Sequence, residues 1–132
     1  MIKSREYVLG IDFGRRNIGL AISEGYLAEP LQTINYSHPK EALAKIKKII
    51  DRNKFDKIVV GVSENEMATI TREFANKLGK ITKLPIVFWD ETLTSVEAGE
   101  KILRKKKTIK ERKIARHQFA AGLILQDYLD QW

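Results

Sequence analysis

The run KIVVGV at residues 57–62 is the feature that most restricts the fold, because it is almost continuously apolar. A strand that is apolar on both sides is typical of a parallel sheet covered on both faces. A second run of this kind, PIVFW, follows at residues 85–89. Between the two runs, residues 67–78 place apolar side chains at helical spacing, and Gly79 is predicted to end that helix. The order strand, helix, strand predicts an α/β domain.

The first third of the chain predicts three further strands. Residues 7–13 and 18–23 are β-rich runs, and Gly14 with the polar residues RRN forms the turn of a hairpin between them. Residues 29–36 indicate a third strand, although Pro30 places its start at an edge or outside the hydrogen-bonded ladder. These strands come before the alternation of helices and strands, so the sheet is expected to be mixed.

Three more helices complete the expected order of elements. One opens at Ser37 and Pro39, one follows a capping box at the start of residues 94–103, and the last covers residues 114–129. We therefore expect a mixed sheet with helices on its faces, in one domain spanning residues 1–132.

The positive charge of the chain is concentrated in one segment. The net charge is +7, and residues 101–116 hold nine of the 24 Lys and Arg residues but one of the 17 acids. The rest of the chain has 15 basic and 16 acidic residues, so it is close to neutral. A local basic patch on a neutral domain favours a polyanionic partner such as a nucleic acid backbone, and the alternative is a solvated, solubilising loop.

Composition also excludes several classes of protein. There is no Cys, so disulfides and thiolate metal sites are excluded, which fits a reducing cytoplasm. The first residues, MIKSREYVLGID, lack the long apolar run and small-residue cleavage site of a signal peptide. No segment approaches the roughly 20 apolar residues that cross a bilayer. We expect a cytoplasmic protein without a membrane partner.

Carboxylates occur where two of the predicted strands end. Asp12 lies inside the apolar run VLGIDF, and Asp90 and Glu91 follow PIVFW. Ligands of open α/β sheets bind beyond the carboxyl ends of the parallel strands, and neighbouring carboxylates there repel each other unless a cation lies between them. A divalent metal site is one reading. Asp12 as an ordinary turn residue and Asp90 as a helix-terminus residue are the alternatives.

Four segments together resemble one known family. GIDFGRRNIGLAIS, IVVGV, WDETLTSVEA and FAAGLILQDYLD are similar, in order and spacing, to the motifs of the YqgF/RuvX family of RNase H-like nucleases, from Leu9 nearly to Trp132. That family is described as Holliday junction resolvases and as nucleases of pre-16S rRNA maturation. The resemblance implies an RNase H-like α/β fold, with a five-stranded mixed sheet of order 3-2-1-4-5 and helices on both faces.

The resemblance also assigns the site, with one departure. The acid of the first family strand corresponds to Asp12, and the later acidic pair to Asp90 and Glu91, with Glu91 the preferred metal ligand. A third family acid, in a motif like Asp-x-x-Ala-Ala, corresponds to His117 in the segment HQFAA. An imidazole can bind Mn²⁺ or carry a proton, so His117 keeps a role in one reading. In the others the site has lost a ligand and its activity, or His117 is a surface residue at a helix start.

Two loops next to this site carry further charges. The family's Gly-Leu-Pro loop after the fourth strand is replaced here by GVSENEMATIT. Glu64 and Glu66 in this loop are either extra metal ligands or, in the favoured interpretation, exposed residues at the start of a helix. Arg15 and Arg16 follow Asp12 directly and either contact a phosphate or form a charged hairpin turn.

These observations predict a metal-dependent endonuclease with Mg²⁺ or Mn²⁺ as cofactor. Asp12, Glu91 and His117 are the expected catalytic and metal-binding residues, with Asp90 as a further ligand. The expected substrate is pre-rRNA or branched DNA, with the ribosome as a second partner, and the chain acts as a monomer or homodimer. The residues expected to contact nucleic acid are Arg15, Arg16, Arg104, Lys105, Lys106, Lys107, Lys110, Arg112, Lys113 and Arg116.

Two alternatives stay open at this point. One is a catalytically impaired nucleic-acid- or ribosome-binding module on the same fold, with His117 marking the lost activity. The other follows from DFGRRNIG, which resembles the phosphate loop of actin-like ATPases and sugar kinases. Those proteins close two such lobes around a nucleotide, and 132 residues supply one, which disfavours this reading.

Overall fold

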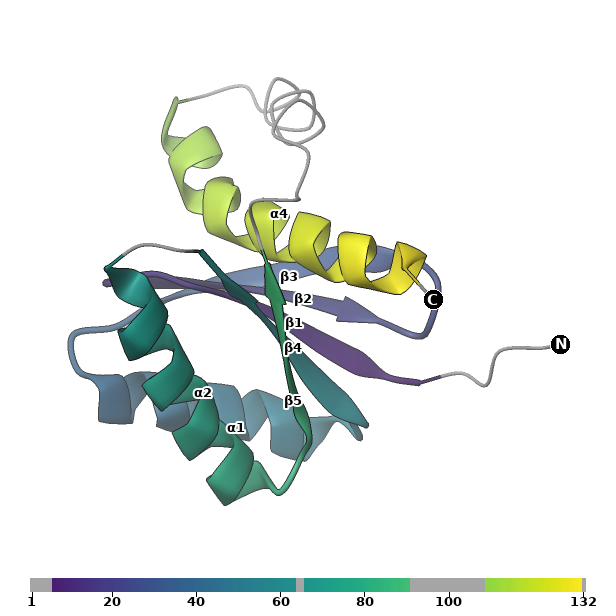
Figure 1. Cartoon of the computed structure of the whole chain (residues 1–132). Coiled ribbons are helices and arrows are strands. Elements are labelled where there is room, and N and C mark those ends of the chain that lie inside the picture. Colours follow the sequence, from purple (N-terminus) through teal and green to yellow (C-terminus); the bar gives the residue numbers. More distant parts are fainter. Residues whose placement is uncertain (1–5, 64–65, 91–108, 132) are drawn as a thin grey trace, which may run out of the picture.

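The protein is an α/β domain with one five-stranded sheet between helices (Figure 1). The computed structural model describes residues 6–63, 66–90 and 109–131. The elements are β1 (Val8–Phe13), β2 (Asn17–Ser23), β3 (Ala28–Asn35), α1 (Pro39–Arg52), β4 (Lys57–Val62), α2 (Met67–Thr82), β5 (Ile86–Asp90) and α4 (Ile109–Asp130). The helix predicted at residues 94–103 lies outside the described residues.

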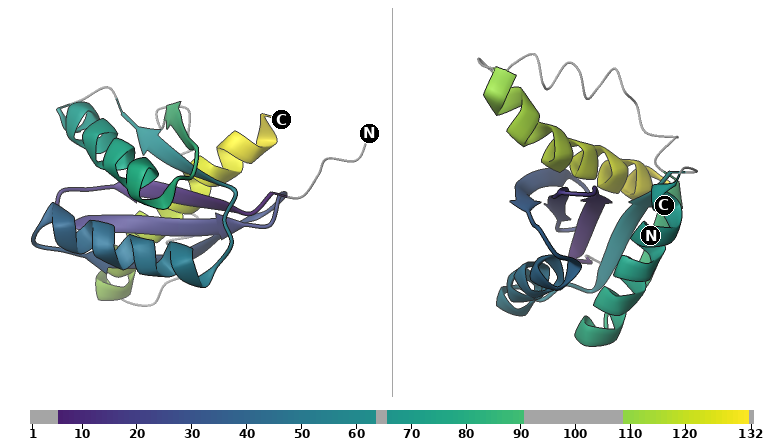
Figure 2. Two further views of the ribbon diagram at one scale, coloured as in Figure 1. Left: turned by 90° about the horizontal axis from the view of Figure 1, so that it is seen from below. Right: turned by 90° about the vertical axis from the view of Figure 1, so that its left-hand side faces the viewer.

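The strand order is β3-β2-β1-β4-β5, as the family resemblance implies. β2 pairs antiparallel with both β1 and β3, whereas β4 pairs parallel with β1 and β5. The mixed sheet and the β1–β2 hairpin are therefore confirmed. Figure 2 shows α4 on one face of the sheet and α1 and α2 on the other.

Each face of the sheet has its own apolar core. Alternation along β1 directs Leu9, Ile11 and Phe13 into the core under α1 and α2, and Val8 into the core under α4. Burying one such Leu or Ile side chain contributes about 1.5–3 kcal/mol. The core under α4 is made by Val8, Ala21, Val59, Ala121, Ile124, Leu125, Tyr128 and Leu129.

Two glycines let α4 lie directly on the sheet. A Cβ atom placed on Gly19 of β2 would lie 1.8 Å from the carbonyl oxygen of His117 in α4. A Cβ atom on Gly10 of β1 would lie 2.8 Å from the Cβ of Leu125. Real Cβ atoms do not approach so closely, so this helix position requires glycine at both places.

The predicted end of the second helix is wrong. α2 passes through Gly79 and continues to Thr82. Its end is made by Lys83, which takes a left-handed conformation (φ 61°) and donates its N–H to the Gly79 carbonyl at 2.8 Å. Gly79 instead gives β5 room, because a Cβ there would lie 2.9 Å from a side-chain carbon of Ile86.

Two other elements differ from their predicted form. α4 begins at Ile109, so the second half of the basic stretch is helical rather than a loop. β5 is half-buried along its length because it is an edge strand of the described sheet, whereas the sequence predicted a buried strand. Pro30 agrees with its prediction, because it lies in the edge strand β3, opposite Ala21, where the register shifts.

None of the helices in the described ranges combines the length and the apolar character that crossing a bilayer requires.

Candidate metal and nucleic-acid site

Asp12 lies near the carboxyl end of β1, on the face covered by α4. It follows Val8 and Gly10 at alternate positions of the strand, and both of these face α4. The side chain of Asp12 is 19% exposed. The charge in the apolar run therefore sits at the rim of the sheet, where solvent reaches it.

His117 of α4 is the side chain that the structure brings to Asp12. Its Nδ1 lies 3.8 Å from Oδ2 of Asp12, and its side chain is 31% exposed. Within the described ranges Asp12 has no other ion pair and no side-chain hydrogen bond. The two residues that the resemblance assigned to one site thus converge.

The glycine contacts described above place His117 at this position. Asp12 pairs with Gly19 in the β1–β2 register, and the backbone of His117 rests on Gly19. His117 therefore arrives one strand away from Asp12, on the same face. A Cβ on Gly14, in the turn after Asp12, would lie 3.6 Å from Cε1 of the imidazole, an ordinary packing distance.

This pair of donors fits a divalent metal ion. A carboxylate and an imidazole together suit ions such as Mn²⁺, and such ions commonly keep several waters and substrate oxygens as further ligands. Among the described residues no group of three His, Cys, Asp or Glu gathers into a metal site. Glu91, the third predicted ligand, lies outside the described residues, as does Glu64.

The structure does not bring Asp90 to this pair. In the strand register Asp12 pairs with Gly61 of β4, and Gly61 pairs with Trp89 of β5. Trp89 is therefore two strands away from Asp12. Trp89 packs on the α4 side, where its Nε1 donates to Oδ2 of Asp127 at 2.7 Å. Asp90 follows it in β5 and so continues the series of Ile86 and Phe88, which face α1 and α2. Its role as a ligand stays a prediction, which the geometry does not support.

Arg15 and Arg16 occupy the turn that follows Asp12, and both are exposed. The Nη2 atom of Arg15 lies 3.7 Å from Oε2 of Glu66, and its Nε lies 3.3 Å from the sulfur of Met67. Glu66 is thus an exposed residue at the start of α2, as the favoured reading expected. Arg16 has no ionic partner among the described residues.

The basic stretch leads into the helix that carries His117. Arg104, Lys105, Lys106 and Lys107 lie outside the described residues. Lys110, Arg112 and Lys113 lie in the first turns of α4, which Figure 1 shows rising off the sheet before the later turns lie along it. Arg116, next to His117, is exposed. The same helix therefore supplies the imidazole and part of the positive charge.

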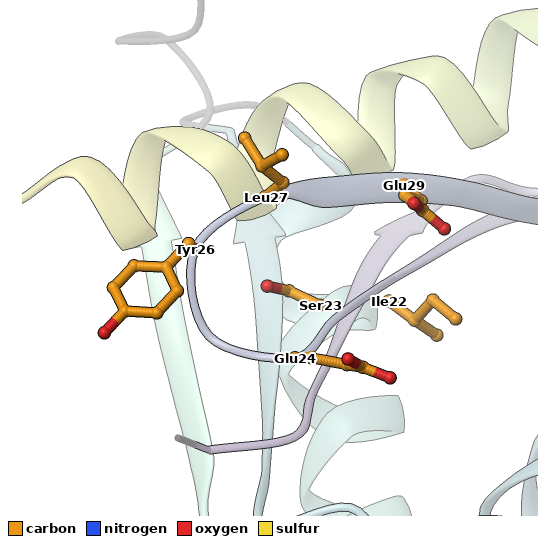
Figure 3. Close-up of a pocket in the computed structure, with 6 residues that line it drawn as sticks. All are labelled: Ile22, Ser23, Glu24, Tyr26, Leu27 and Glu29. Carbon is orange, nitrogen blue, oxygen red and sulfur yellow. The ribbon is translucent and has the colours of Figure 1, made fainter. Parts of the chain in front are cut away.

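A separate hollow lies at the opposite end of the sheet. It measures about 320 Å³ and is lined by Ile22, Ser23, Glu24, Tyr26, Leu27 and Glu29. Ser23 pairs with Val8, at the start of β1, whereas Asp12 is near its end. In Figure 3 Ser23 points into the bend between β2 and β3, and its Oγ accepts the N–H of Gly25 at 3.0 Å. This hollow does not belong to the Asp12 site.

The sequence reasoning missed how α4 is seated. Gly10, Gly19 and Ala21 are small residues that share the α4 face, and their alternate positions in two paired strands were a signal for close approach. It also missed Tyr36, whose hydroxyl donates to the carbonyl of Gly14 and whose N–H donates to the carbonyl of Arg16 at 3.0 Å.

Comparison with known proteins gives concordant results. The family model described as "RuvX: Holliday junction resolvase" matches residues 6–131. A protein of Koribacter versatilis named "Putative pre-16S rRNA nuclease" is 37% identical, over 94% of this chain and 86% of its own length. The fowlpox virus Holliday junction resolvase has a TM-score of 0.63 at 10% identity, over 95% and 98% of the two chains. The RuvC protein of T. thermophilus, solved with a Holliday junction substrate, has a TM-score of 0.57 at 11% identity, over 94% and 97%.

Proposed function

Because the chain belongs to the RuvX family, we propose that it is a metal-dependent nuclease that hydrolyses phosphodiester bonds in structured nucleic acid. The convergence of Asp12 and His117 at the sheet's edge, with Nδ1 and Oδ2 3.8 Å apart, carries this proposal. No observation on the described residues favours the catalytically impaired alternative.

Asp12, His117 and Glu91 would hold the metal ion, Mg²⁺ or Mn²⁺. Such an ion, when bound, activates water and offsets charge on the phosphate. Asp12 supplies an anionic oxygen donor. His117 supplies a nitrogen donor from the ring atom that faces Asp12, or moves a proton at that atom. The contact of the His117 backbone with Gly19, the strand partner of Asp12, places the imidazole beside the carboxylate.

Exposed cations beside this pair would hold the sugar–phosphate backbone. Arg16 is exposed in the turn after β1, the strand that carries Asp12, and Arg116 is exposed next to His117 on α4. The sequence adds further basic residues before Arg116, at Lys110, Arg112 and Lys113 and at Arg104–Lys107, and we propose that they contact the same backbone. Contacts of this kind give affinity and register rather than base readout.

The names of the relatives support two candidate substrates. The Koribacter protein's name points to pre-16S rRNA, and the T. thermophilus structure contains a four-way DNA junction. We propose that this chain cuts one of these two substrates, with the ribosome as a partner in the first case. A homodimer suits the symmetric junction, and a monomer suits rRNA trimming.

A cleavage assay with a matched pair of variants tests the proposal. Asp12→Asn removes the carboxylate charge at the site, and Asp51→Asn removes the same charge from the exposed face of α1. With Mg²⁺ or Mn²⁺, the wild type and Asp51→Asn should cut a labelled four-way junction or a pre-16S rRNA fragment. Asp12→Asn should lose at least about 100-fold in rate while still binding. Equal rates for Asp12→Asn and the wild type, or no cleavage by the wild type with either ion, would overturn the proposal.

A further inference from the structure

An open polar groove lies beside the turn that follows Asp12. It measures about 470 Å³. That is within the roughly 300–1,000 Å³ of small-molecule sites. Its lining is formed by Arg16, Asn17, Asn35, Tyr36, Ser37, Glu41 and Lys45. These residues come from the β1–β2 turn, the end of β3 and the first turns of α1, so the groove curves around one corner of the sheet.

The groove begins close to Asp12. Gly19 is the direct partner of Asp12 in β1–β2, and Asn17 lies two residues further along β2 on the same face. Two residues of an extended strand span about 7 Å, so Asn17 lies about this far from Gly19 along β2. Asn17 pairs with Asn35, so two amide side chains stand next to each other at the mouth of the groove, on the α4 side.

One wall of the groove is fixed to the turn after Asp12. The N–H of Tyr36 donates to the carbonyl of Arg16 at 3.0 Å, and the hydroxyl of Tyr36 donates to the carbonyl of Gly14. Burial raises the pKa of Tyr36, so this hydroxyl keeps its proton. Two hydrogen bonds therefore tie this wall of the groove to the turn that follows Asp12.

The groove presents donors and acceptors that face solvent. Nζ of Lys45 lies 2.9 Å from Oε1 of Glu41 and donates to the carbonyl of Asn35 at 3.0 Å, which leaves one of its three N–H groups available. Glu41 is held ionised, because hydrogen bonds from Lys45 and from the backbone N–H of Ser37 lower its pKa. Arg16 has an exposed guanidinium without an ionic partner among the described residues.

We propose that this groove binds the nucleotide that adjoins the cleaved phosphodiester of the substrate strand. Arg16 and the remaining N–H of Lys45 contact its phosphate. Asn17 and Asn35 hydrogen-bond the sugar or base, and Glu41 accepts from base amino groups or a sugar hydroxyl. This inference rests on the proposed nuclease function and adds a substrate subsite to it.

Binding measurements with a matched control test this subsite. Lys45→Gln and Lys47→Gln remove the same charge from α1, and both lysines form an i,i+4 ion pair at similar exposure, 47% and 45%. Arg16→Gln is the second groove variant. The probes are a labelled four-way DNA junction and an RNA hairpin with a single-stranded tail, without divalent metal, so that nothing is cut.

Lys45→Gln and Arg16→Gln should each weaken binding of the probe by about fivefold or more and reduce the dependence of log K on log salt by about one. Lys47→Gln should stay within about twofold of the wild type. Equal affinity of Lys45→Gln and Lys47→Gln for both probes would overturn the subsite. Equal melting temperatures of these two variants exclude a folding defect as the cause of a difference.

A photocrosslink gives a positional readout that does not depend on cleavage. An RNA tail carrying 5-iodouridine should crosslink to Tyr36 in the wild type, and crosslinks found only outside the groove contradict the proposal. If Asp12→Asn loses cleavage but the groove variants bind the probe as tightly as the wild type, the subsite alone is overturned. If the groove variants weaken binding but the wild type does not cut, the nuclease function alone is overturned.

Discussion

The backbone of His117 occupies the space where a side chain at Gly19 would lie. The distance from a Cβ at Gly19 to the His117 carbonyl oxygen would be 1.8 Å. Since Gly19 is the strand partner of Asp12, this contact sets both the height of α4 above the sheet and the approach of His117 to Asp12.

Gly19→Ala should therefore separate α4 from the sheet. We expect a loss of about 1–3 kcal/mol in the free energy of unfolding, as in other overpacked sites, together with weaker Mn²⁺ binding. Urea unfolding and calorimetric titration with Mn²⁺ measure the two effects. Gly122→Ala is the control, because a Cβ there would meet Pro30 at an ordinary 3.5 Å and the helix gains about 0.5–1 kcal/mol from alanine. A Gly19→Ala protein as stable as Gly122→Ala would contradict the packing argument.

His117→Ala should weaken Mn²⁺ binding by about tenfold, or about 1.4 kcal/mol, because one donor is lost. His117→Asp should bind Mg²⁺ better relative to Mn²⁺ than the wild type, since a carboxylate replaces an imidazole. Titration calorimetry with each ion alone gives both affinities. His38→Ala changes the other of the two histidines, at the exposed start of α1, and should leave them unchanged. Unaltered Mn²⁺ affinity in His117→Ala would remove the imidazole from the site.

Lys57 should stabilise the fold in a pH-dependent way. Its Nζ lies 2.7 Å from Oε2 of Glu6 and donates to the hydroxyl of Tyr128 at 3.1 Å. Burial alone would lower the pKa of Lys57, but the bonds with Glu6 and Tyr128 outweigh it and the pKa is raised. The charged form is therefore favoured by folding. Its stabilisation is complete below the unfolded pKa of about 10.4 and is lost as pH rises through the folded value.

Lys57→Met should thus cost about 1–2 kcal/mol in urea unfolding at pH 8, and the difference from wild type should shrink above about pH 10.4. Lys54→Met, at an exposed position, is the control for the loss of one charge. A difference that stays constant through the alkaline range would show that packing, rather than charge, is responsible.

Tyr36→Phe should lower the free energy of unfolding by about 1 kcal/mol, because it removes the hydrogen bond to the Gly14 carbonyl and keeps the ring. Tyr7→Phe is the matched control: its ring packs on Phe55 at 4.6 Å, and within the described ranges its hydroxyl has no hydrogen bond. Hydrogen exchange should also become faster at the Tyr36 N–H, which donates to Arg16. Equal stability of the two variants would show that the hydroxyl does not hold the turn.

Sequence patterns predicted the presence of helices and strands better than the residues at which they end. The runs 57–62 and 85–89 predicted their strands because continuous apolar character has few other uses in a domain of this size. The end of α2 could not be predicted from Gly79, because that glycine serves the packing of Ile86, a contact between residues of different elements. Lys83, which does end the helix, carries no local signal for a left-handed conformation.

The site was predictable in part. Family resemblance pointed to Asp12 and His117, and their convergence needed the register of β1 and β2 and the seating of α4. The orientation of Asp90 is predictable from the sequence, because period-two alternation in PIVFWD places Asp90 and Trp89 on opposite faces of the strand. The groove at Lys45 could not be predicted, because it forms where the β1–β2 turn meets residues 35–45, and that contact depends on the strand register.

The seating of α4 on Gly19 uses the peptide backbone of residue 117 and leaves its side chain at the rim. The contact that seats α4 therefore does not depend on which side chain stands at position 117, so a histidine or an aspartate there leaves this backbone contact unchanged. Gly19, on the neighbouring strand, is the position at which a side chain has no room.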